Sequence, residues 1–319
     1  MGSQRQRKKS SERSSRHQAQ VGRKGGLHRS SRTMEKRINH RDMSPAQKAA
    51  FINAFLALKN SVDSVLHPGR QKRYDDFVEV HKNAMTGPDM FMPMPHGSPL
   101  FFPWHRIMLR QFELELQRAV NDPTVTLPYW DWNMNGLNSP FVSEFLGGDG
   151  DAAQNNRVQS GSFAFATGQF DIRVWDEGTG DQGLRREFGD DATAWLPDAS
   201  DIAAGIGRTP YWPGAASFER VAEGVLHNPV HRWIGGNMAE ATSPNDPVFF
   251  LHHAFLDLLW ERWKLQHPTI DPYLPTTSSQ GLGLDATLVF NAPGNPPPWS
   301  GSWTVSQVVD PANLGYEYA

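Results

Sequence analysis

Apolar residues recur every three or four positions in several stretches of this chain, which is the spacing of one face of an α-helix. The first stretch follows Ser44-Pro45-Ala46-Gln47, a segment with a serine N-cap, proline at the first helical position and glutamine where a capping box needs it. Its apolar face comprises Phe51, Ala54, Phe55, Leu58 and Val62. The pattern predicts a helix from residue 45 that ends at His67-Pro68-Gly69.

Two further helical stretches each carry a histidine on the apolar face. Between residues 72 and 85, one face is shared by Tyr74, Phe77, Val78, His81 and Met85. His105 opens another helix, and the face that it starts continues through Met108, Phe112 and Leu116. A single inward histidine is more often a hydrogen-bonded core residue than a ligand, so His81 alone carries no assignment.

The stretch from Leu226 to Trp263 holds a second group of histidines. His227 and His231 are four residues apart, which on a helix places both imidazoles on one face, about 6 Å apart. Asp246-Pro247 has the character of an N-cap and first helical position, so His252 and His253 are expected in the second turn of a new helix. This spacing indicates a site for a metal ion, although two ligands from one helix rarely complete such a site.

His96 lies in a loop rich in proline and glycine, which can aim a side chain into a site without regular structure. The chain thus offers three inward histidines in each half: His81, His96 and His105, then His227, His231 and His253. Neutral imidazole suits copper, zinc, iron and nickel, so the ligand type leaves the metal open, and zinc held by three histidines is the leading alternative.

Between and after these segments the helical pattern weakens. Residues 138–213 are rich in glycine, aspartate and proline, which predicts long loops with minor helices. Near the C-terminus, ATLVF and SWTVSQVV have the composition of short strands. The chain is therefore expected to be mainly α, with long loops and a few short β-strands.

The amino-acid composition limits the kinds of metal site and catalysis that this chain can support. The 319 residues are 38% hydrophobic, enough for a substantial core. Cysteine is absent, which excludes disulfides, thiolate metal sites and a cysteine nucleophile. Residues 1–40 are basic and nearly free of large apolar side chains, so we expect a disordered extension, with the folded domain at 41–319. A polyanion-binding arm is the less favoured interpretation of that extension, because no aromatic binding platform accompanies it.

Six segments resemble the two metal-binding regions of the tyrosinases, the type 3 binuclear copper proteins, and the bacterial members above all. They are HKNAM, MPHGSP, FFPWHRIMLRQFE, LPYWDW, LHNPVHRWIGG and SPNDPVFFLHHAFLDLLW, and the similarity extends from about residue 40 to the C-terminus. The resemblance implies a four-helix bundle that holds two copper ions. It implies first-site ligands His81, His96 and His105, second-site ligands His227, His231 and His253, and leaves His252 as a supporting neighbour. Six histidines without a carboxylate also favour copper over a zinc hydrolase site.

The function implied by the resemblance is ortho-hydroxylation of monophenols and oxidation of o-diphenols to o-quinones, with O2 as co-substrate. Asn228 matches a position linked in that family to phenol hydroxylation, where an asparagine and a glutamate orient a water as proton acceptor. Glu223, four residues before His227, is the first choice for that glutamate and Glu219 the second. The alternatives are an o-aminophenol oxidase, a diphenol-only catechol oxidase and a hemocyanin-like O2 carrier.

Several further expectations concern the surroundings of the site. The small Ala241 lies where that family has its substrate gate and suggests an open entrance. Asp257 is expected to bind Arg262 or Arg232 in a structural role. Some tyrosinases crosslink a cysteine to a first-site histidine, and without a cysteine His96 has loop packing alone to fix it. Neither a secretory signal nor a membrane span is recognised, so a cytoplasmic location is expected, with a copper-delivery helper protein and export by it as further expectations.

Overall fold

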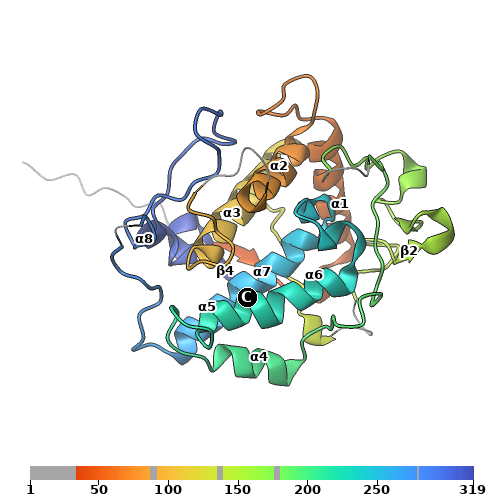
Figure 1. The fold of residues 1–319 in the computed structure, drawn as a ribbon. Coiled ribbons are helices and arrows are strands. Elements are labelled where there is room, and N and C mark those ends of the chain that lie inside the picture. Colours follow the sequence, from red (N-terminus) through yellow and green to blue (C-terminus); the bar gives the residue numbers. More distant parts are fainter. Residues whose placement is uncertain (1–33, 87–91, 135–138, 176–179, 279) are drawn as a thin grey trace, which may run out of the picture. The chain divides into compact units, whose positions relative to one another are not determined.

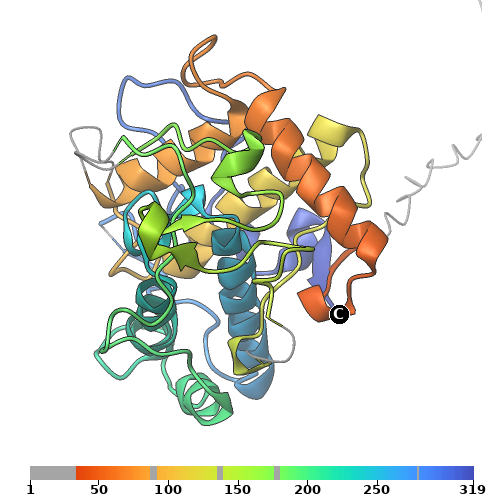
Figure 2. The ribbon, with the colours of Figure 1, turned by 90° about the vertical axis from the view of Figure 1, so that its right-hand side faces the viewer.

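The computed structural model describes residues 34–319 except 87–91, 135–138, 176–179 and 279. Residues 1–33 of the expected basic extension therefore lie outside the described residues. Its last part does not behave as expected, because Glu35–Arg37 form strand β1, which pairs in parallel with β4 (Tyr316–Tyr318). The start of the described chain and its C-terminus consequently lie side by side (Figure 2).

Helices dominate the fold, as the pattern predicts (Figure 1). The α-helices are α1 (Pro45–Asn60), α2 (Arg73–Met85), α3 (Phe101–Val120), α4 (Ala199–Ile206), α5 (Phe218–Val221), α6 (Asn228–Ile234), α7 (Val248–Gln266) and α8 (Val305–Val308). A π-helical segment, η5 (Ala222–His227), joins α5 to α6 without a break. A second pair of short strands, β2 (Gly150–Asp151) and β3 (Arg157–Val158), is antiparallel.

Short 3-10 helices occupy many of the connections. They are η1 (His40–Asp42), η2 (Trp132–Met134), η3 (Ala152–Gln154), η4 (Phe165–Thr167), η6 (Gly236–Ala239), η7 (Ser243–Asn245) and η8 (Pro311–Leu314). Between residues 139 and 213 the described chain consists of loops, these single turns, the β2–β3 pair and α4, which confirms the expectation of long loops with minor helices.

An aromatic cluster joins four of the long helices. Phe112 of α3 stacks face to face on Phe250 of α7, with ring centroids 3.5 Å apart and planes 8° from parallel. Phe55 of α1, Tyr74 of α2 and Phe77 of α2 meet the Phe112 ring edge-on at 5.0–5.6 Å. All five rings are buried, so the bundle is held by one dense core rather than by separate helix pairs.

Three sequence predictions about local structure are wrong. The first helix ends at Asn60 instead of near residue 66, because the Asp76 carboxylate accepts the backbone N–H groups of Val65 and Leu66 and gives this segment another set of hydrogen bonds. The segment SWTVSQVV contains helix α8 rather than a strand, since Thr304 and Gln307 form a capping box. ATLVF contributes an isolated bridge, Thr287 to Thr304, and no strand.

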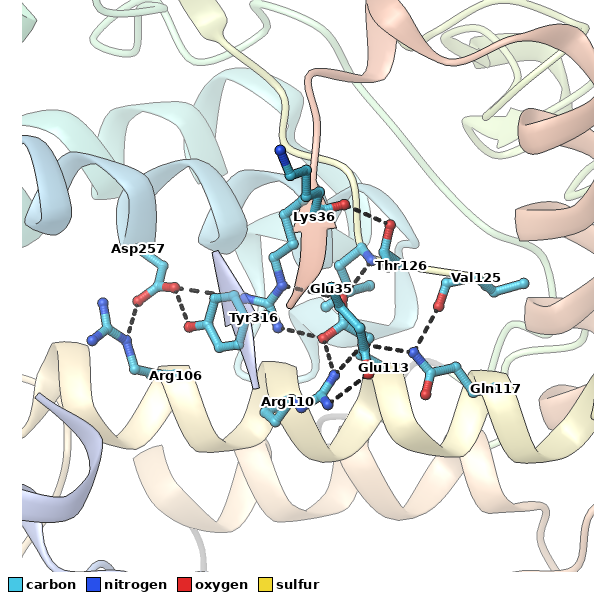
Figure 3. Close-up of polar contacts among 12 residues, drawn as sticks. Glu35, Lys36, Arg106, Arg110, Glu113, Gln117, Val125, Thr126, Asp257 and Tyr316 are labelled. Carbon is cyan, nitrogen blue, oxygen red and sulfur yellow. Dashed lines mark hydrogen bonds and ion pairs between the residues drawn. The ribbon is translucent and has the colours of Figure 1, made fainter. Parts of the chain in front are cut away.

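A buried ionic network fastens both ends of the folded chain to the bundle (Figure 3). Arg37 of β1 donates from Nε and Nη2 to the two oxygens of Glu113 on α3, at 3.1 and 2.9 Å. Arg110, one turn before Glu113, donates to Glu113 and to Glu35. Both Arg37 and Glu113 are fully buried, so water could not replace either partner if the other charge were removed.

The same network reaches α7 through Asp257. This carboxylate accepts from Arg106 Nε at 2.7 Å and from the hydroxyls of Tyr316 and Tyr318 at 2.6 and 2.7 Å. The expected structural role of Asp257 is thus supported, but the expected partners Arg262 and Arg232 are wrong. Arg106 replaces them because α3 and α7 lie against each other, which sequence spacing does not reveal.

Candidate metal centre

The first three expected ligands come together from two helices and a loop. His81 lies on α2, His105 on the second turn of α3 and His96 in the loop that precedes α3. Each offers one ring nitrogen, and these nitrogens lie within 4.8 Å of one another. The ring nitrogens Nε2 of His81 and His105 are buried and have no hydrogen-bond partner. Two buried acceptors without a partner, facing a third imidazole, are what a metal ion would satisfy.

The second three ligands converge even more closely. His227 ends η5, His231 lies on α6 and His253 on the second turn of α7. His253 Nε2 is 3.3 Å from His227 Nε2 and 3.4 Å from His231 Nε2. The rings of His105 and His253 stack at 4.3 Å, so the two triads are neighbours in one site.

Hydrogen bonds on the far side of the rings fix which nitrogen faces the site. Nδ1 of His81 donates to the Ala241 carbonyl, of His105 to the Phe101 carbonyl, and of His231 to the Met238 carbonyl, each at 2.7–2.8 Å. His227 Nδ1 donates to Asn228 Oδ1 at 2.8 Å. With the proton on Nδ1, the Nε2 lone pair of each ring is free for a metal.

Burial keeps these imidazoles neutral. It lowers the pKa of His81 to about 3 and that of His231 to about 4. Burial, with further lowering by neighbouring histidines, holds the pKa values of His96, His105, His227 and His253 well below the usual 6.5. At neutral pH the cluster is therefore a set of uncharged ligands, and His253 Nε2 lies within 3.4 Å of the Nε2 atoms of both His227 and His231.

A fourth histidine stands beside the second triad. His252 is fully buried, neither of its ring nitrogens has a hydrogen-bond partner, and one of them is within 4.8 Å of the His227, His231 and His253 ligand atoms. Its ring lies nearly parallel to that of His227, at 5.2 Å, and against Trp132 at 5.1 Å. His252 is thus within reach of the second triad, and its role as a supporting neighbour stays a prediction.

A pocket of about 480 Å³ opens onto both triads. Its lining includes His81 and His96 of the first triad, His227 and His231 of the second, and Met85, Asn228, Arg232, Glu240 and Ala241. Ala241 is one of the pocket's lining residues, and its backbone carbonyl accepts the hydrogen bond that orients the His81 ring. A small aromatic molecule can reach the metal ligands through this space.

The two candidate glutamates have different surroundings. Glu223 is largely buried beside the loop of His96, and both its oxygens accept the Gly97 N–H, at 2.8 and 2.9 Å. Glu219 is fully buried, and its carboxyl group shares a side-chain hydrogen bond with that of Glu223. Burial and the negative charge of Glu223 raise the pKa of Glu219 to about 9, whereas burial raises that of Glu223 and the Gly97 N–H lowers it in part.

Three groups around the site were not predicted from the sequence. The carbonyls of Phe101, Met238 and Ala241 orient three ligands, and backbone acceptors leave no mark on residue identity. The sequence also gives no signal for the π-helical turn, in which the Asn228 N–H bonds to the Glu223 carbonyl. Such wide turns often occur at functional sites, and this one carries both Glu223 and His227.

Fold and site together define a class: a helical-bundle protein with two adjacent histidine triads that could each hold a metal ion beside one pocket. Residues 71–266 match the common central domain of tyrosinase. The chain is 38% identical to the tyrosinase of Streptomyces antibioticus over 254 residues, which cover 76% of this chain and 87% of that one. It is 35% identical to the grixazone synthase of Streptomyces griseus over 287 residues, with 77% and 89% covered.

A variant of the polyphenol oxidase of Thermothelomyces thermophila has the same fold, with a TM-score of 0.67 at 22% identity over 89% of this chain and 88% of that one. The chain belongs to the tyrosinase family. It is accordingly a copper-dependent oxidoreductase that oxidises phenols, and the two histidine triads fit a binuclear copper site. No helix among the described residues is long and apolar enough to cross a membrane.

Proposed function

We propose that this enzyme hydroxylates monophenols at the ortho position and oxidises o-diphenols to o-quinones, with O2 as co-substrate. The observation that carries the proposal is the convergence of two all-histidine triads at the inner end of one pocket, with Asn228 on the pocket wall. His81, His96 and His105 would hold one copper ion, and His227, His231 and His253 the other. When bound, the copper pair supplies the redox chemistry that lets O2 accept electrons from the phenol.

The protein's own part is to place the ring and remove the phenolic proton. A phenol with a pKa near 10 keeps its proton at neutral pH, so hydroxylation needs a proton acceptor close to the metal ligands. Asn228 Oδ1 is engaged by His227, which leaves its amide N–H free to orient a water in the pocket. Glu223 is the carboxylate that we pair with it, because it lies one helical turn before His227 and accepts a hydrogen bond from Gly97, next to His96.

Three alternatives share the same ligand set. An o-aminophenol oxidase would use the same pocket for an aromatic amine, and a catechol oxidase would lack the proton acceptor. A hemocyanin-like carrier would bind O2 without admitting a substrate, and the pocket of about 480 Å³ over the ligands argues against it.

Oxygen uptake by the copper-loaded protein distinguishes these functions. We expect two copper ions per chain and uptake with a monophenol, a catechol and, more weakly, an o-aminophenol. Uptake with catechol alone would make the enzyme a catechol oxidase, and faster uptake with the aminophenol than with either phenol would make it an aminophenol oxidase. One copper per chain, or no uptake with any substrate, would refute the proposal.

Asn228→Asp tests the proton-transfer step. The aspartate keeps an oxygen for His227 Nδ1 but loses the amide N–H, so copper content is expected to stay at two per chain. Because general acid–base assistance contributes factors of 10² or more, monophenol turnover is expected to fall about 100-fold while catechol turnover changes little. Asn133→Asp, at an exposed position outside the pocket, is the control. Equal losses on both substrates would exclude this role for Asn228.

We further propose that a separate delivery protein supplies the copper and assists export. Full copper loading and activity after expression of the chain alone in copper-rich medium would show that no such helper is required.

A further inference from the structure

His96 is held differently from the other five ligands. The others lie on helical segments, whereas His96 lies in an irregular loop between α2 and α3. Four of those five have Nδ1 bonded to an oxygen, but Nδ1 of His96 is buried and has no hydrogen-bond partner. The chain also has no cysteine with which to crosslink this ring. Besides ring contacts with His81 and His105, the position of His96 therefore depends on contacts of its loop.

The loop makes its strongest such contact one residue further on. Gly97 has a left-handed backbone (φ +66°), which turns its N–H outward, and that N–H donates to both oxygens of Glu223 at 2.8 and 2.9 Å. The turn itself is closed by Ser98, whose hydroxyl donates to the Met94 carbonyl at 2.7 Å. At the far end, the Tyr211 hydroxyl donates to the Pro99 carbonyl. Of these contacts, the hydrogen bond from Gly97 to Glu223 is the one at the residue adjacent to His96.

Glu223 itself is largely buried, in the π-helical turn that ends with His227. Its ion pair with the partly exposed Arg220, at 3.6 Å, is beyond hydrogen-bond distance and is a weak contact. In such surroundings little water competes for the hydrogen bond that Glu223 accepts from Gly97 N–H. The carboxylate thus connects the loop of a first-site ligand with the helix of a second-site ligand.

We propose that Glu223 is a positioning residue that tethers the His96 loop to the helix carrying His227 and thereby fixes the relation between the two metal sites. This inference rests on the dicopper site of the proposed function. It gives Glu223 a role separate from proton transfer, since the tether acts on metal binding before any phenol arrives. Partners that orient metal ligands typically contribute 10- to 100-fold to metal affinity.

The experiment compares Glu223→Ala and Glu223→Gln with the wild-type chain and with Arg220→Gln as control. Glutamine keeps one oxygen for the Gly97 N–H, and the control removes the partly exposed ion pair but leaves the tether. The first readout is amide hydrogen exchange of residues 92–100 in metal-free protein, which requires neither copper nor activity. The second readout is the rate at which a chelator removes copper. It is combined with electron paramagnetic resonance, in which an isolated Cu(II) ion gives a signal and a coupled Cu(II) pair does not.

We expect Glu223→Ala to speed exchange at Gly97 and to release the first copper 10- to 100-fold faster, with an isolated-Cu(II) signal. Glu223→Gln should lie between this variant and the wild type, and Arg220→Gln should match the wild type. Unchanged exchange and copper release in Glu223→Ala would overturn the tether. If copper stays bound and only monophenol turnover falls, the proton-transfer role holds and the tether fails. An inactive wild type that shows the expected exchange pattern would instead refute the proposed function.

Discussion

Replacing Asp257 by alanine tests the buried network that joins the two ligand-bearing helices α3 and α7. Asp257 is one helical turn after His253, and its chief partner Arg106 directly follows His105. The substitution removes a charged hydrogen bond at 2.7 Å and two hydroxyl bonds at 2.6 and 2.7 Å. It also leaves Arg106, fully buried, with Glu261 as its remaining carboxylate partner.

Breaking a buried ion pair by removing one partner costs about 3–5 kcal/mol, and the Arg106–Glu261 contact keeps the expected loss near 4 kcal/mol. For a folded chain of this size each kcal/mol lowers the melting temperature by roughly 2 °C, so we expect a decrease of about 8 °C. Thermal unfolding of the metal-free protein measures it. Asp63→Ala, which removes an exposed pair with Lys72, is the control and should lower stability by less than about 1 kcal/mol.

The pH dependence of the stability lost in Asp257→Ala tests whether that loss is electrostatic. Burial alone would raise the pKa of Asp257, but Arg106 and Arg37 outweigh it and hold the pKa below its usual value. A carboxylate with a depressed folded-state pKa stabilises the protein above the unfolded pKa of about 4, and this contribution is lost as pH falls through the folded pKa. The difference between wild type and Asp257→Ala should therefore shrink below about pH 4. A pH-independent difference, or one under about 1 kcal/mol at pH 7, would refute the charge-based account.

Two other substitutions probe the core and the pocket. Phe250→Ala removes the ring that stacks on Phe112 at 3.5 Å, and the resulting cavity is expected to lower the free energy of unfolding by about 3–5 kcal/mol, measured by chemical denaturation. Leu265→Ala, at a position 81% exposed, is the control. Equal effects of the two substitutions would show that the stack contributes nothing to stability. Ala241→Phe places a ring on the pocket wall while leaving the carbonyl that orients His81, so KM for catechol should rise about tenfold or more with copper content unchanged. An unaltered KM would place the substrate route elsewhere.

Local signals in the sequence were reliable where a short segment determines its own structure. The capping box at Ser44 and Gln47 starts α1 as predicted, and the inward faces of α2 and α3 carry His81 and His105 into the core. The same kind of signal was outweighed at the end of α1, where the carboxylate of Asp76, from another helix, captures the backbone of residues 65 and 66. At Thr304 the opposite error occurred, since β-branched residues suggested a strand where a capping box starts a helix.

The sequence by itself determined the ligand types, their spacing on each helix and the mainly helical fold, because periodicity and capping act over a few residues. Only the tertiary structure decided which nitrogen of each ring faces the site, since the orienting acceptors at Phe101, Met238 and Ala241 are backbone carbonyls common to all residues. It also decided the partner of Asp257 and the contact between Glu223 and Gly97, residues 126 positions apart. Such pairings depend on how helices lie against one another, and no local pattern records that.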